Sequence, residues 1–355
     1  MGNGFLDRVE DNAAVRTWSE MIQREKGGSL AEGYWNNEVS QLFYSNYRDL
    51  PYLLDMKVDK RLFQALAQFW NSAYSCFTFG KIDLVPTIEE YIALLRCSRV
   101  QVDRVYSKAV NVPTFLMKLM NITGMSEQWV IARIKQKGDS RCIPWKNLRD
   151  LILAHPDARK KVDVFALSIY GLIVFPKTLG HVDEADTDLF DLLDKRVTPV
   201  PIILAETFRS LNACRRAGEG RFIGCAQLLL VWFHSHFWKV DKVSYRVFSE
   251  SYSPLKEIVA TPRRDDISEE KWMAIFQNFQ EEDIEWRALW LLPDEILYRS
   301  MQLVPVTQGL AECEFSYGGE GYKKKAREMA SAWNQTRRMK RLAVGPMTTP
   351  EYSEW

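Results

Sequence analysis

The chain is organised around Phe222–Trp238, which reads F-I-G-C-A-Q-L-L-L-V-W-F-H-S-H-F-W. Only Gln227, His234, Ser235 and His236 interrupt its apolar side chains. A helix that is apolar on every face has to be buried on every face. The stretch therefore predicts a helix at the centre of a helical domain, with other elements packed around it.

This central stretch is too short for a membrane span. It has 17 residues with two imidazoles near its end, whereas a spanning helix needs about 20 consecutive apolar residues. The N-terminal sequence M-G-N-G-F-L-D-R-V-E-D has no apolar run of the kind that a secretory signal requires. We therefore expect a protein that neither crosses a membrane nor is secreted.

The composition is that of an ordinary globular protein. Of the 355 residues, 46% are hydrophobic and 26% are charged. This length allows two domains of about 150 residues each, or one large helical domain with an irregular tail. The net charge of +1, from 47 basic and 46 acidic residues, argues against nucleic-acid binding by the protein as a whole, although local basic patches can still bind. The six cysteines form no C-x-x-C pair, which favours a reducing compartment without disulfides.

The sequence before the central stretch continues the helical pattern. Val164–Phe175 is almost wholly apolar, and Pro201–Ala217 carries Leu204, Phe208 and Leu211 on one face. Three apolar helices in succession predict one continuous core from about Val164 to Trp238. Further helices are predicted at residues 15–26, 113–120, 126–136, 145–153, 188–193, 268–292 and 326–342.

A β-hairpin is predicted at about residues 74–85. Tyr74–Phe79 and Ile82–Val85 flank Gly80 and Lys81, and a two-residue loop with glycine first suits a type II′ turn that pairs Phe79 with Ile82. Directly afterwards, Thr87-Ile-Glu-Glu90 has the spacing of a capping box and opens a helix. The predicted fold class is mainly α: a multi-helix globular domain with this one small hairpin.

Two blocks of sequence resemble a known family. The first is Phe69-Trp-Asn-Ser-Ala-Tyr-Ser-Cys-Phe-Thr-Phe-Gly-Lys-Ile-Asp-Leu-Val-Pro-Thr-Ile-Glu-Glu-Tyr-Ile-Ala-Leu-Leu95. The second is Ile203–Leu211, followed by Gly220–Phe237 with its Trp232. Their order and spacing resemble the plant mobile domain, from about Asn36 to Arg299, with the likeness strongest to plant proteins that carry a domain of unknown function.

The resemblance implies a mainly helical plant protein, partly spread by retrotransposons, with relatives that act in the nucleus in transposon silencing. It also implies a protein partner, which is phosphatase-like in some members. On this basis we expect a lead-in at residues 1–58, a core domain at 59–299 and a loop-rich, basic segment at 300–355. The family pattern is shortened here, because Tyr298 and Arg299 run almost at once into Met301–Pro305.

Several polar groups are candidate binding sites. His234 and His236 are two residues apart, so on a helix they point in different directions and cannot bind one metal together; we interpret them as core or interface histidines. The acidic run Asp183–Asp191 lacks the glycine and the final glutamate of a calcium loop, and is typical of carboxylates at a helix N-terminus. Glu206 lies among apolar residues, where burial would raise the pKa of its carboxyl; a solvated edge or a single salt bridge would also explain it.

No catalytic, cofactor or metal motif was found, and we predict no cofactor. A schiff-base lysine with a phosphate loop, a P-loop and a G-x-S-x-G elbow are all missing from the sequence. Basic clusters serve as nuclear import signals or contact phosphate backbones, and one such cluster near the C-terminus is the best site candidate, although a solvated helix face would explain it too. Its residues are Lys323, Lys324, Lys325, Arg327, Arg337, Arg338, Lys340 and Arg341.

Three functional hypotheses follow. The first is a non-catalytic nuclear interaction module related to transposon or chromatin control, with a protein partner and nucleic-acid contact through the C-terminal basic cluster. The second is a hydrolase or transferase with a site assembled only in three dimensions. The third is a transposon-derived fragment without selected function, which the short junction near Arg299 motivates. The expected location is the nucleus, or otherwise the cytoplasm.

Overall fold

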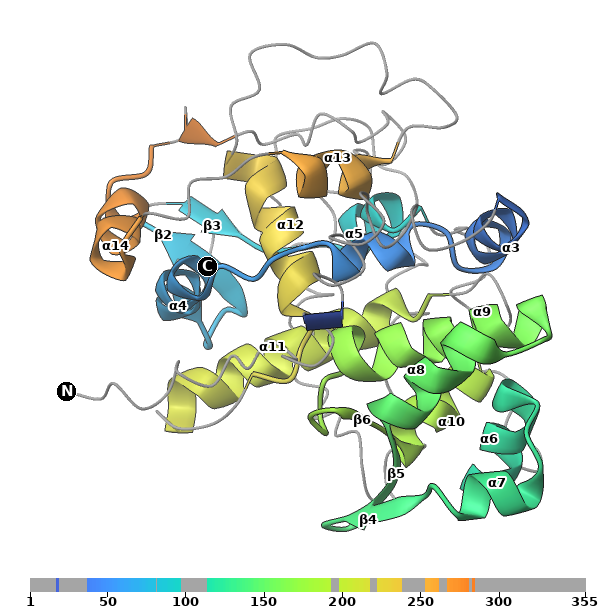
Figure 1. Cartoon of the computed structure of the whole chain (residues 1–355). Coiled ribbons are helices and arrows are strands. Elements are labelled where there is room, and N and C mark those ends of the chain that lie inside the picture. Colours follow the sequence, from blue (N-terminus) through green and yellow to red (C-terminus); the bar gives the residue numbers. More distant parts are fainter. Residues whose placement is uncertain are drawn as a thin grey trace, which may run out of the picture.

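The computed structural model (Figure 1) describes residues 17–18, 37–80, 82–96, 114–192, 198–217, 222–237, 253–261, 267–280 and 283–284. This part of the chain is mainly helical, which confirms the predicted class, and it also contains two small three-stranded antiparallel sheets. The helices are α3 (Asn37–Tyr47), α4 (Lys60–Gln68), α5 (Ile88–Leu94), α6 (Phe115–Thr123), α7 (Glu127–Ile131), α8 (Trp145–Ala154), α9 (Ala158–Ile169), α10 (Glu184–Leu192), α11 (Val200–Ala217), α12 (Ala226–Phe237), α13 (Pro254–Ala260) and α14 (Glu269–Gln277).

The apolar stretch forms the buried helix α12, as its pattern predicts. Every residue from Ala226 to Phe233 is buried, and so is His236. Helices α5 and α13 and a π-helical turn at Tyr170–Val174 pack against it. Figure 1 shows α12 crossing the middle of the molecule between these elements. The core is continuous, because one cluster of buried side chains includes residues of α9, α11 and α12.

The first sheet forms where the hairpin is predicted. Strands β2 (Cys76–Phe79) and β3 (Ile82–Leu84) pair with Phe79 opposite Ile82, and Gly80 between them has a φ of +63°. Such a positive φ costs glycine little, because it has no Cβ. A short third strand, β1 (Trp70–Asn71), extends the hairpin. The Phe77 ring stacks on Trp232 at 5.9 Å between ring centroids, which joins this sheet to α12.

The second sheet was missed by the sequence patterns. Residues 126–136 are predicted as one helix, but α7 ends at Ile131 and the chain continues into strand β4 (Lys135–Lys137). Strands β4, β5 (Ser140–Pro144) and β6 (His181–Asp183) lie in that order in the sheet. Gly138 therefore turns a hairpin, in which Lys137 pairs with Ser140, instead of ending a helix.

Helix α14 is shorter than the predicted helix over residues 268–292. It begins one residue after the predicted start, where the Ser268 side chain caps it by accepting a hydrogen bond from the Lys271 N–H, and it ends at Gln277. The Asn278 side-chain amide donates to the Ala274 carbonyl at 2.8 Å. A short polar side chain that binds the backbone in this way competes with continuation of the helix.

One glycine allows two elements to approach closely. Gly171 lies in the π-helical turn, where the Phe175 N–H donates to the Tyr170 carbonyl at 2.8 Å. A Cβ at Gly171 would lie 2.9 Å from both methyl groups of Val182 and 3.0 Å from Asp186 Oδ2. The missing side chain thus lets this turn lie directly against β6 and α10.

Candidate functional site

The most extensive polar group inside the core surrounds Glu90. Thr87 precedes α5 and forms the predicted capping box: the Glu90 N–H donates to Thr87 Oγ1 at 3.3 Å, and the Thr87 N–H donates to Glu90 Oε2 at 2.9 Å. The sequence does not predict that the same carboxylate also reaches α12. Trp232 Nε1–H donates to Glu90 Oε2 at 3.0 Å, and His236 Nε2 lies 2.9 Å from Glu90 Oε1.

We call Thr87, Glu90, Trp232 and His236 the Glu90 cluster. Trp232 and His236 are four residues apart on α12, so both face α5. A carboxylate only accepts hydrogen bonds, so in this contact His236 Nε2–H donates to Glu90 Oε1. Glu90 and His236 are each 1% exposed. The cluster therefore ties two helices together inside the core, and the interpretation of His236 as a core histidine is confirmed.

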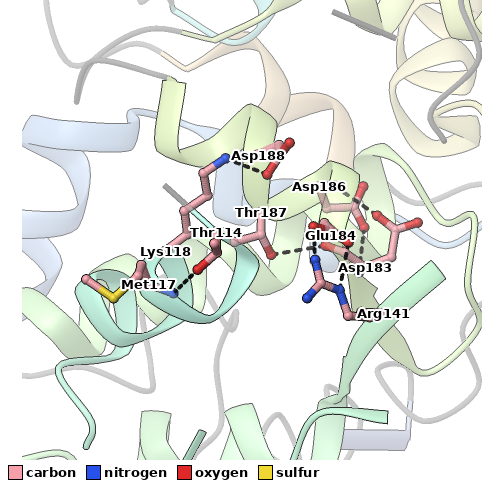
Figure 2. A network of polar contacts seen from close by, with 9 residues as sticks. All are labelled: Thr114, Met117, Lys118, Arg141, Asp183, Glu184, Asp186, Thr187 and Asp188. Carbon is pink, nitrogen blue, oxygen red and sulfur yellow. Dashed lines mark hydrogen bonds and ion pairs between the residues drawn. The ribbon is translucent and has the colours of Figure 1, made fainter. Parts of the chain in front are cut away.

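A second polar group lies where β6 leads into α10 (Figure 2). The Asp186 N–H donates to Asp183 Oδ1 at 2.9 Å, and the Asp183 N–H donates to Asp186 Oδ2 at 3.1 Å. This is the reciprocal arrangement of a capping box, with aspartate at both positions. Glu184 and Asp186 lie in the first turn of α10, which confirms that the acidic run stands at a helix N-terminus.

The environment of Asp186 favours its protonated form. Burial raises the pKa of Asp186 well above its usual value of 3.8, and the neighbouring Asp183 charge raises it further. Asp183 Oδ2 and Asp186 Oδ1 are buried and have no hydrogen-bond partner among the described residues. A proton on Asp186 removes the repulsion between the two carboxyl groups. The buried pair is therefore stable with Asp186 neutral.

Two ion pairs connect α10 to its neighbours, as Figure 2 shows. Lys118 of α6 is fully buried, and its ammonium lies 2.5 Å from Asp188 Oδ1. Arg141 of β5 binds Glu184 at the surface through two hydrogen bonds of 2.6 and 3.1 Å. Loss of the first pair should lower the free energy of unfolding more than loss of the second, because breaking an ion pair in the core is costly whereas surface pairs contribute little.

The other predicted sites have simple environments or lie outside the described residues. Glu206 is buried and bound by Arg209, three residues along α11, so it forms the single salt bridge and does not lie on a solvated edge. His234 is half-buried beside the Phe233 ring. The C-terminal basic cluster, from Lys323 to Arg341, lies outside the described part of the chain. Within the described ranges, no three His, Cys, Asp or Glu side chains come together as metal ligands.

Comparison with known proteins gave one match. The model of the family DUF7745, described as a domain of unknown function, matches residues 34–301. The chain belongs to this family. No curated protein and no solved structure matches it significantly. In the described part of this DUF7745 protein, no helix is long and apolar enough to cross a bilayer.

We predict that Glu90→Gln destabilises the DUF7745 domain by about 2–4 kcal/mol, because it removes a charged acceptor and turns an amide N–H₂ toward a buried donor. Urea unfolding followed by circular dichroism measures the loss. The control is Glu127→Gln at the exposed start of α7, which should cost less than about 1 kcal/mol. Equal costs for the two variants would contradict a structural role for the Glu90 cluster.

Lys118→Met should cost about 3–5 kcal/mol in the free energy of unfolding, because the buried Asp188 carboxylate loses the ammonium that lies 2.5 Å from its Oδ1. Adding Asp188→Asn to the same chain removes the charge of that carboxylate and should restore part of the loss. If the double variant is less stable than Lys118→Met, the cost does not come from the lost contact between Lys118 and Asp188.

The Asp183–Asp186 pair should make stability depend on pH. The folded state binds the Asp186 proton more tightly than the unfolded state, so this contribution is complete below about pH 3.8 and is lost as the pH rises through the raised pKa. Asp186→Asn can keep the capping hydrogen bonds with residue 183, but its side chain does not titrate. Its stability relative to the wild type should therefore rise between pH 5 and pH 9 in urea unfolding. Asp139→Asn, at an exposed turn, should follow the wild type; a constant difference for Asp186→Asn would exclude this role of Asp186.

Proposed function

We propose that this DUF7745 protein is a non-catalytic interaction module. The observation that supports this best is that the buried side chains of Glu90 and Lys118 bind other side chains of the core. Glu90 binds Trp232 and His236, and Lys118 binds Asp188. A group that takes part in acid–base or nucleophilic chemistry must be able to reach a substrate. These groups instead use their hydrogen-bonding capacity to join helices.

The place of action that we propose is the nucleus, in transposon or chromatin control. Two sequence features support it: the resemblance to the plant mobile domain, and the C-terminal basic cluster with Lys323, Lys324, Lys325 and Arg327 in its first half. Paired basic runs of this kind serve in nuclear import. A protein partner, phosphatase-like as the resemblance implies, belongs to the same proposal.

The nuclear part is tested with a fluorescent fusion of the full chain. The wild-type fusion should accumulate in the nucleus, and replacing Arg337, Arg338, Lys340 and Arg341 with alanine should lower the nuclear-to-cytoplasmic ratio severalfold. The control replaces with alanine four basic residues of α8 and α9 whose side chains are exposed or half-buried: Lys146, Arg149, Arg159 and Lys161. A wild-type fusion that stays cytoplasmic, or a C-terminal variant that behaves like the wild type, would contradict nuclear import through this cluster.

The interaction part is tested by affinity purification of the full chain, followed by mass spectrometry. A module of this kind should recover the same partner in repeated purifications, and it should do so without turnover of added esters, phosphoesters or peptides. Recovery of no reproducible partner would contradict the proposal, and so would catalytic turnover that disappears with a core variant.

A further inference from the structure

The segment of the chain that contains the β4–β5 hairpin is rich in basic residues. Residues 127–161 hold nine basic and four acidic side chains, a net charge of +5 within a chain whose total is +1. All three residues of β4, Lys135, Gln136 and Lys137, are exposed. Neither lysine has an ion-pair partner among the described residues. Strand β4 thus presents two positive charges that no described acidic side chain neutralises.

Strand β4 is also an open sheet edge. It is terminal in the order β4-β5-β6, and Figure 1 shows it at the lower margin of the molecule. The Lys135 carbonyl accepts from Cys142 Sγ at 3.4 Å and so points toward β5. Backbone groups alternate along an antiparallel strand. The N–H and C=O of Gln136 therefore point outward, where another strand could pair with them.

From this geometry we infer that β4 binds an extended acidic segment of a partner protein, which adds to the sheet as a fourth strand. The inference rests on the proposed function and names the class of partner. A residue that pairs with the outward backbone of Gln136 places its two neighbours opposite Lys135 and Lys137. In antiparallel pairing, the Cα atoms of two such opposite residues are about 4.5 Å apart. A partner segment therefore fits this edge when two acidic residues in it are separated by one residue of any kind.

Charge on this edge selects the strand that can join it. Lysines on an edge strand discourage pairing with apolar or basic strands, which protects a protein from aggregation. The same lysines attract carboxylates, because opposite charges directly across two strands stabilise the pair. Ile131, at the end of α7 and four residues before Lys135, is 55% exposed and offers the same partner an apolar side chain. A nucleic acid would use the charge but neither the Gln136 backbone nor Ile131.

Fluorescence anisotropy with the full chain tests the inference. The probe is a labelled ten-residue peptide of alternating glutamate and threonine, and it should bind the wild type. The double variant Lys135→Glu with Lys137→Glu should weaken binding at least tenfold and should instead bind a lysine–threonine peptide. The control variant, Lys146→Glu with Arg159→Glu, makes the same change of net charge on α8 and α9 and should lower the affinity less than threefold. Circular dichroism verifies that each variant is folded.

The backbone contact is tested separately at Gln136. Gln136→Pro removes the outward N–H, a change that an edge strand tolerates, and should weaken peptide binding at least fivefold. Gln136→Ala keeps the N–H and should bind like the wild type. A peptide that fails to bind the wild type, or that binds all these variants equally, overturns the inference. So does binding of a twenty-nucleotide DNA strand that depends on Lys135 and Lys137 while the peptide does not bind.

Affinity purification with the Lys135→Glu, Lys137→Glu double variant separates this inference from the proposed function. If the wild type recovers a reproducible partner and the double variant loses it, both stand. If both chains recover the same partner equally, the interaction module stands and the assignment to β4 fails. If neither chain recovers a partner, the proposed function itself fails.

Discussion

Glu90 is enclosed by the core, and a buried carboxylate without partners would be strongly destabilising. It is tolerated because four donors surround it: the backbone and hydroxyl of Thr87, the indole of Trp232 and the imidazole of His236. These donors come from two elements more than 140 residues apart in the sequence. Satisfying Glu90 therefore fixes the position of α12 against α5.

The apolar packing around α12 then follows from that fixed position. Trp232 binds Glu90 with its indole nitrogen and stacks its ring on Phe77. Phe233, on a different face, contacts Phe276 of α14 at 5.4 Å between ring centroids. Hydrophobic burial is not directional, so burial alone would let a helix that is apolar on every face rotate about its axis or shift along it. The hydrogen bonds to Glu90 give the helix one orientation and one register.

The sequence predicts those features of the fold that local patterns encode. The buried helix, the Phe79–Ile82 pairing and the Thr87 capping box each follow from a few neighbouring residues, and each is confirmed. The second sheet is missed because Lys135-Gln-Lys137 has no apolar alternation. Gly138 and Asp139, as a two-residue turn between Lys137 and Ser140, were the signal that could have revealed this hairpin.

The polar sites are harder to predict, because their partners are distant in the sequence. His236 and Glu206 are recognised as residues in an apolar context, but only the structure joins His236 to Glu90. Lys118 and Asp188 are 70 residues apart, and nothing near either one indicates a buried pair. The proton-binding pair of Asp183 and Asp186 is partly visible, since both belong to the acidic run. Its burial comes from β6 and the π-helical turn, which the sequence patterns do not place.

Gly171 limits how this protein can drift in sequence. Any side chain there would enter the space of Val182 and Asp186 and push the π-helical turn away from β6 and α10. Even alanine, the smallest replacement, would therefore disturb the N-terminus of α10. At Gly138 a Cβ would meet no atom within 4 Å, so only the positive φ restrains that position. Among relatives of this fold, a substitution at position 171 requires a compensating change in the residues that face it, whereas the hairpin tip is free to vary among residues that tolerate its backbone.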